Sequence, residues 1–171
     1  TDACLGQLDP AQLAKVDASG YHVSGARPSK TVRLHQSIYQ AACASDPDTR
    51  CIIHTHSTHC VAQSLRAQPI QTPLGPELLP ALTPYYVMKV GHVPLIPYHR
   101  PGDPKAAEQV VQAILAYAQA GHPIRAVMLE RLGPNVWHDH PMTAMATLDE
   151  LEETARLWQM APTTPLTPDH I

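Results

Sequence analysis

The stretch CIIHTHSTHC, from Cys51 to Cys60, decides how the rest of the chain is interpreted. It begins with apolar and β-branched residues, which are typical of a buried strand. Because successive side chains of a strand point to opposite faces, His54 and His56 project from the same face. Two neutral imidazoles side by side at the end of a strand can both bind one divalent metal ion. The spacing therefore predicts a metal site at His54 and His56, with two solvated histidines as the alternative interpretation.

The composition limits the class of protein. The chain has 171 residues, enough for one domain with a buried core but too few for a complete eight-fold barrel, another fold that uses His-x-His. Its formal net charge of -3 and scattered Lys and Arg residues argue against a nucleic-acid or membrane surface as the main partner. The sequence contains no membrane-length apolar run, and its four cysteines form no Cys-x-x-Cys pair. We therefore expect a soluble, cytoplasmic protein.

Apolar periodicity and capping residues predict a series of helices and strands. Helices are expected over residues 10–16, 27–43, 57–65, 103–120 and 147–160. Strands are expected over residues 21–23, 51–56, 93–99 and 125–129, with another following in LGPNVW. The proline-rich range 68–80 predicts a loop. We interpret the acidic run Asp149, Glu150, Glu152 and Glu153 as a solvated helix face.

The order of the motifs resembles that of the class II aldolase and adducin family. The resemblance rests on PSK at 28–30, HTHSTHC at 54–60, LTPYYVMKVG at 82–91, VPLIPYHRPGDP at 93–104, LGP at 132–134 and LDELEETARLW at 148–158. Within that family the likeness is greatest to the 3-oxo-tetronate 4-phosphate decarboxylases. It implies an α/β fold, a three-layer α/β/α arrangement with a mainly antiparallel central sheet. It also implies a single domain over residues 1–171 that lacks the family's N-terminal segment.

The resemblance also implies a carbon–carbon lyase that uses Zn²⁺ or another divalent metal. Such a metal stabilises the enediolate formed when a small phosphorylated sugar acid or ketose is cleaved. By resemblance, His54 and His56 are two of its three histidine ligands, and Ser29 and Lys30 bind the substrate phosphate. Tyr85, or its neighbour Tyr86, lies in the segment from which aldolases draw a catalytic tyrosine at a subunit interface. A homo-oligomer, commonly a homotetramer, is therefore implied.

Two positions depart from the family's pattern. Thr31 occupies the catalytic position where the family has a glutamate, and a hydroxyl is a poor general base near neutral pH. Leu132 stands where the family has its third histidine ligand, and a leucine side chain cannot bind a metal. One of His99, His138 and His140 could replace that ligand, although turn histidines with no ligand role are the alternative.

Three functions remain open from the sequence. The first is decarboxylation of a phosphorylated sugar acid, and the second is the related L-fuculose-phosphate aldolase or 4-epimerase chemistry. The third is a catalytically silent, adducin-like module that keeps the fold for binding or assembly. The intact PSK, HTHSTH and PYYVM segments favour enzymatic ancestry, whereas Thr31 and Leu132 favour the silent module.

Overall fold

The computed structural model describes residues 7, 9–66, 68–161 and 163–167 of the chain. Its helices are α1 (Val32–Ala42), α2 (Thr58–Ser64), α3 (Pro84–Lys89), α4 (Pro104–Gln119) and α5 (Pro141–Met160), preceded by the 3₁₀ turn η2 (Pro10–Gln12). Its strands are β1 (Lys15–Val16), β2 (His22–Ser24), β3 (Cys51–His54), β4 (Ile70–Thr72), β5 (Gly75–Glu77), β6 (Leu95–Ile96), β7 (Ala126–Leu129) and β8 (Gly133–His138). None of the described helices has the length and apolar character needed to cross a membrane.

A four-stranded mixed sheet, in the order β3-β8-β7-β6, forms the centre of the fold. β8 pairs antiparallel with both β3 and β7, whereas β6 runs parallel to β7. The parallel pair arises because α4 connects β6 to β7, and a helical crossover returns the chain in the same direction. The predicted α/β class is therefore confirmed. The prediction of a mainly antiparallel sheet is wrong, because the sheet is mixed.

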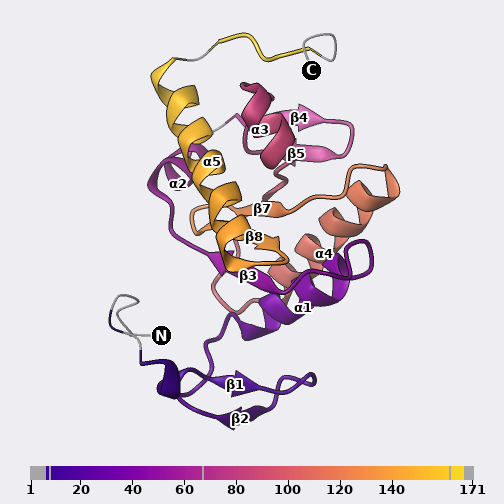
Figure 1. Ribbon diagram of the computed structural model, residues 1–171. Coiled ribbons are helices and arrows are strands. Elements are labelled where there is room, and N and C mark those ends of the chain that lie inside the picture. The colour runs from indigo at the N-terminus through magenta and orange to yellow at the C-terminus, as the bar shows by residue number, and fades with distance from the viewer. Residues whose placement is uncertain (1–6, 8, 67, 162, 168–171) are drawn as a thin grey trace.

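Helices cover both faces of this sheet. One face packs against α2, α3 and α5 through Ile53, Ala126, Met128 and Val136. The other face packs against α1 and α4 through Ile52, Val127, Leu129 and Trp137. Figure 1 shows α1 beside α4 on one side of the strands, α5 beside α2 on the other, and the β1–β2 hairpin apart from the sheet. Because side chains alternate along β3, His54 lies on the face that α1 and α4 cover.

Most expected helices are present, but two of them begin elsewhere. The helix expected from residue 27 begins at Val32, where Thr31 is the N-cap residue and makes no capping bond through its side chain. The last helix begins at Pro141 instead of residue 147, because the His140 ring accepts a hydrogen bond from the Met142 amide and caps an earlier turn. α4 begins after its Asp103 cap, as predicted.

Two predictions near the sheet's periphery are wrong. Residues 68–80 are not a simple loop, because β4 and β5 pair as an antiparallel hairpin. Near the N-terminus, only the η2 turn forms in place of a helix over residues 10–16, and β1 takes Lys15 and Val16 to pair with β2. In both segments, pairing with a second strand overrides the local preference.

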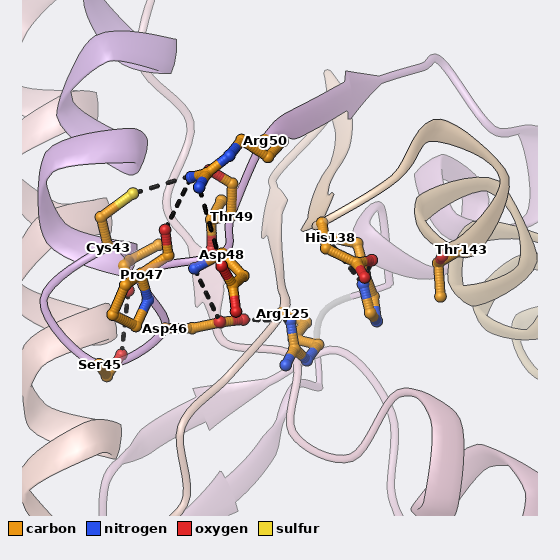
Figure 2. A network of polar contacts seen from close by, with 12 residues as sticks. Cys43, Ser45, Asp46, Pro47, Asp48, Thr49, Arg50, Arg125, His138 and Thr143 are labelled. Carbon is orange, nitrogen blue, oxygen red and sulfur yellow. Dashed lines mark hydrogen bonds and ion pairs between the residues drawn. The ribbon is translucent and has the colours of Figure 1, made fainter.

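Charged side chains fix the turn that leads from α1 into β3. Asp46 accepts a hydrogen bond from Arg125 at 2.6 Å, and Arg50 donates to the Pro47 carbonyl at 2.7 Å (Figure 2). Arg125 immediately precedes β7, so the first contact ties the turn to the centre of the sheet. The contact holds the turn beside the strand end, while pairing with β8 sets the register that places His54 opposite Asn135.

One acidic residue of α5 caps a neighbouring helix. The Glu152 carboxylate accepts hydrogen bonds from the amides of His59 and Cys60 at 2.8 and 3.0 Å, and from the His59 ring at 2.8 Å. Burial raises the pKa of this carboxyl, but the two amides and the side chains of His59 and Cys60 outweigh that effect and hold the pKa below its usual value. The interpretation of the whole acidic run as a solvated face is therefore wrong at Glu152, which satisfies the first turn of α2.

Replacing this cap should destabilise the fold. We expect Glu152→Gln to lower the free energy of unfolding by about 1 to 2 kcal/mol, because one side of the cap loses its acceptor. Glu153→Gln, which removes only an exposed 3.3 Å contact with Arg156, is the matched control and should change it by less than about 0.5 kcal/mol. The Glu152 pKa is lowered in the folded chain, so the carboxylate stabilises the parent over Glu152→Gln mainly above pH about 4.3. This difference in the free energy of unfolding should shrink as the pH falls below that value. Urea unfolding of both variants measures the free energy of unfolding. Equal decreases in the two variants would contradict the role of Glu152 as the cap of α2.

Candidate active site

A cavity of about 730 Å³ lies between the N-terminal ends of α1 and α4 and the C-terminal end of β3. We call it the site cavity. It brings together five of the residues predicted from the sequence: Ser29, Lys30, Thr31, His54 and His56. The segment around His99 and the turn between β7 and β8 complete its wall. Residues that are far apart in sequence therefore meet where the motifs predicted a site.

The two histidines face each other at the cavity wall. Their ring centres are 5.4 Å apart and their planes are inclined by 74°. A bound zinc lies about 2 Å from each ligating nitrogen, so two imidazoles that share one ion have ring centres about 5 Å apart. His54 Nδ1 donates a hydrogen bond to the Pro134 carbonyl at 2.9 Å, which leaves Nε2 as the nitrogen with a free lone pair. The ring spacing suits two ligands of one metal ion, and His54 has the tautomer that a ligand needs.

The protonation state of His54 also suits a ligand. Burial lowers the pKa of His54 and the nearby His56 lowers it further, while the hydrogen bond to Pro134 partly opposes both effects. The ring is therefore neutral at neutral pH, and only a neutral imidazole can bind a metal ion.

A glycine at the start of β8 allows the backbone to reach the histidine segment. Gly133 has a φ of +137°, and a Cβ built there would lie 1.9 Å from the Thr55 carbonyl oxygen. No other residue fits at this distance without moving the backbone. The turn therefore packs directly against the residue between His54 and His56, and it places the Pro134 carbonyl against the His54 ring.

Comparison with known proteins gives the family of this fold and site. Residues 1–159 match the family described as Class II Aldolase and Adducin N-terminal domain. This chain belongs to the class II aldolase and adducin family. The resemblance inferred from the motifs is therefore confirmed.

The relatives of this class II aldolase-family chain include decarboxylases and aldolases. It is 50% identical over 167 residues to the 3-oxo-tetronate 4-phosphate decarboxylase of Cupriavidus necator, an alignment that spans 96% of this chain and 69% of the relative. It is 37% identical over 157 residues to the Escherichia coli decarboxylase of the same name, spanning 92% of this chain and 67% of that one.

Solved structures agree with this placement. The crystal structure of YgbL from Escherichia coli, described as an aldolase, epimerase or decarboxylase, superposes with a TM-score of 0.82 at 34% identity and covers 99% of this chain and 76% of that one. L-fuculose-1-phosphate aldolase from Thermus thermophilus shares the fold, with a TM-score of 0.61 at 23% identity, over 92% of this chain and 75% of that one.

The third ligand of the family's pattern is not replaced within the described residues. Leu132 lines the site cavity, but its side chain is apolar. His99 lines the same cavity, with Nε2 in a 2.8 Å hydrogen bond to a side-chain amide of α4. His138 belongs to the polar network of Figure 2, and His140 caps α5. In the part of the chain that the structure describes, no three His, Cys, Asp or Glu side chains could hold a metal ion together. The described residues therefore do not complete a zinc site, and a ligand role for His54 and His56 stays a prediction.

The remaining wall of the cavity is mostly apolar, and its polar part holds hydroxyl groups, three cations and the carboxylates of Asp103 and Glu108. Ser29 Oγ lies 3.0 Å from Thr31 Oγ1 at the start of α1. Lys30, Arg33 and Arg100 line the cavity, and none of the three makes an ion pair with another described residue. Three unpaired cations near two hydroxyls form a site that suits an anionic ligand.

Tyr85 is not brought to the cavity by this chain alone. It lies on α3 with 61% of its surface exposed, and its ring is 5.7 Å from the Lys89 ammonium. Tyr86 is the buried one of the two, with 1% exposed. A role for Tyr85 at an interface between subunits stays a prediction.

Three cavity residues were not singled out from the sequence. Arg33 and Arg100 flank the PSK and PGDP motifs, and their nearness to those motifs was the available signal. Asn135 is fully buried in β8, with Val136 and Trp137 following it. A polar residue in an otherwise apolar strand was the signal for this position.

The missing ligand can be tested directly. We expect Leu132→His to tighten Zn²⁺ binding by about 100-fold or more at pH 7.5, because it adds a third nitrogen ligand to the pair at His54 and His56. Isothermal titration calorimetry measures the affinity, and Leu132→Asn is the control of similar polarity. The gain should vanish when His56→Ala is added. Equal zinc affinity in the parent and in Leu132→His would show that the parent already holds a complete site.

Proposed function

We propose that this chain is a slow carbon–carbon lyase that acts on a small phosphorylated sugar acid, in the manner of its 3-oxo-tetronate 4-phosphate decarboxylase relatives. The observation that carries the proposal is the site cavity, which joins cations at the start of α1 and in the loop before α4 to the histidine pair at the end of β3 and just after it. Retro-aldol cleavage and 4-epimerisation of a sugar phosphate are the close variants, because they pass through a similar enediolate. A homo-oligomer that supplies Tyr85 from a second subunit belongs to the same proposal.

The cationic wall accounts for recognition of the substrate. Lys30 and Ser29 are assigned to the phosphate, since an ammonium and a hydroxyl both donate to phosphate oxygens. Arg33 and Arg100 line the same cavity and can neutralise a second anionic group, such as the carboxylate of a sugar acid. A ligand with negative charge at both ends fits a wall with three unpaired cations better than a neutral sugar does.

The reaction class follows from the chemistry of such an acid. Loss of CO₂ breaks the bond between the carboxyl carbon and its neighbour, and the electron pair passes to the adjacent keto group as an enediolate. A proton then adds to the carbon that lost the carboxylate. A 3-keto acid therefore needs stabilisation of negative charge more than it needs a strong base.

Zinc dependence is not part of this proposal. The described residues supply His54 and His56 but no third ligand, so no step is assigned to a metal. Thr31 is likewise assigned only to hydrogen bonding, through its 3.0 Å contact with Ser29, because its hydroxyl is a poor base. Leucine in place of a third ligand at Leu132 and threonine in place of an acid–base group at Thr31 are the reasons for expecting slow turnover.

The second candidate function is a catalytically silent module that binds the same ligand. Leu132 favours it, because its side chain packs on the core cluster of α1 and α4 and removes a ligand position from the cavity. Release of CO₂ from 3-oxo-tetronate 4-phosphate above the rate in buffer supports the lyase. Binding without such release supports the silent module.

Phosphate recognition provides the first test. We expect Lys30→Met to weaken binding of a tetronate 4-phosphate by about 10- to 100-fold, because one charge-assisted contact is lost. Lys15→Met, on the β1–β2 hairpin outside the cavity, should leave the affinity unchanged. Calorimetric titration of both variants decides, and equal affinities would remove Lys30 from the phosphate site.

Catalysis provides the second test. We expect the double variant Thr31→Glu with Leu132→His, supplied with Zn²⁺, to release CO₂ about 100-fold faster or more, since a positioned acid–base group contributes about 10² to 10⁴. Thr31→Gln with Leu132→His is the matched control, which has the third ligand but no ionisable group. If the double variant binds zinc and substrate and shows no gain, the cavity is not a lyase site and the silent module stands.

A further inference from the structure

A group of partnerless polar atoms lies beneath the histidine pair. His35 Nε2 and both amide atoms of Asn135, Nδ2 and Oδ1, are buried without a hydrogen-bond partner among the described residues. Asn135 has 0% of its surface exposed, yet it lines the site cavity. It pairs directly with His54 in the β3–β8 ladder, on the face covered by α1 and α4. The amide therefore faces the cavity beside the first of the two imidazoles.

These atoms are costly to leave unpaired. A buried polar group without a partner destabilises a fold by about 1 to 3 kcal/mol, and nearly all buried amides in proteins are hydrogen-bonded. A valine would fill the same strand position with no such cost, as Val136 does next to it. The His35 ring lies close enough to the Asn135 amide to pair with one of its two polar atoms, and that pairing leaves the other amide atom without a partner. The Asn135 amide therefore has capacity for a partner that enters the cavity.

The chemistry of the amide selects the kind of partner. An asparagine side chain donates through Nδ2 and accepts through Oδ1. A phosphate or carboxylate group only accepts, so its charge would be repelled by Oδ1, and an ammonium group only donates. A hydroxyl both accepts and donates, so it can satisfy the two sides of the amide at once.

We propose that Asn135 binds a hydroxyl group of the sugar-acid ligand, with Nδ2 donating to the hydroxyl oxygen and Oδ1 accepting its proton. The inference rests on the proposed function, since it takes the ligand to be a phosphorylated sugar acid. It adds a specificity-determining residue that distinguishes hydroxylated acids from their deoxy analogues. The bound hydroxyl lies next to His54, so the amide also fixes which end of the ligand approaches the imidazoles.

Two matched variants and two matched probes test the proposal. The variants are Asn135→Val and Asn135→Thr, which have the same shape and differ by one hydroxyl. The probes are erythronate 4-phosphate and 4-phosphooxybutanoate, which share the phosphate and the carboxylate and differ in the hydroxyl groups. Calorimetric titration gives the dissociation constant of each pair, and urea unfolding shows whether each variant is folded.

The parent chain should bind the hydroxylated probe at least about tenfold more tightly than the deoxy probe. Asn135→Val should abolish this preference and leave the affinity for the deoxy probe within about twofold of the parent. Asn135→Thr should retain part of the preference, because its hydroxyl can still make one hydrogen bond.

Two other results overturn the inference, and they differ in what they say of the proposed function. If both probes bind and Asn135→Val still prefers the hydroxylated probe, the amide does not bind the hydroxyl. The proposed phosphate site is not contradicted by that result. A rise in the free energy of unfolding of Asn135→Val with unchanged affinities also removes the amide from ligand recognition. If the parent binds neither probe, the proposed function fails, and the role of Asn135 fails with it.

Discussion

The close approach of the β7–β8 turn to the end of β3 is the constraint on which the site depends. Gly133 lies so near the Thr55 carbonyl that a Cβ would be 1.9 Å from its oxygen. This contact brings the Pro134 carbonyl to the His54 ring and so selects the tautomer whose Nε2 is free. Leu132 and Asn135 flank the same turn. This backbone contact therefore holds the His54 ring, Leu132 and Asn135 at the same side of the cavity.

Local patterns were sufficient for the elements that local forces determine. α4 has a cap, a proline at its first position and a regular apolar stripe, and it forms where these signals place it. The β4–β5 hairpin has no such pattern, because its prolines and Gly75 indicate a loop until the two strands pair. The direction of β6 relative to β7 could not be predicted either, because the sequence of a strand does not determine whether its neighbour runs parallel or antiparallel.

The site was predictable to the extent that neighbours in sequence are neighbours in space. The strand predicted over residues 51–56 ends at His54, but His56 still reaches the cavity two residues later. Ser29, Lys30 and Thr31 follow from one motif that the family shares. The Asn135 amide depends on a strand pair that joins segments about 80 residues apart, as His54 and Pro134 are. The error at Glu152 has the same origin, because the amides that it caps lie 93 and 92 residues earlier in the chain.

In the proposed function, recognition and catalysis depend on different groups, and Thr31 and Leu132 belong to the second set. The cations that line the cavity lie at the start of α1 and in the loop before α4, and none of them makes an ion pair with another described residue. Leu132 instead packs on the core of α1 and α4, where an apolar side chain adds burial that an imidazole would not. Leucine at this position is therefore compatible with the packing of the fold, while under the proposed function it offers no ligand for charge stabilisation. Because binding energy that is equal in ground and transition states does not raise the turnover rate, an intact anion site is compatible with slow chemistry.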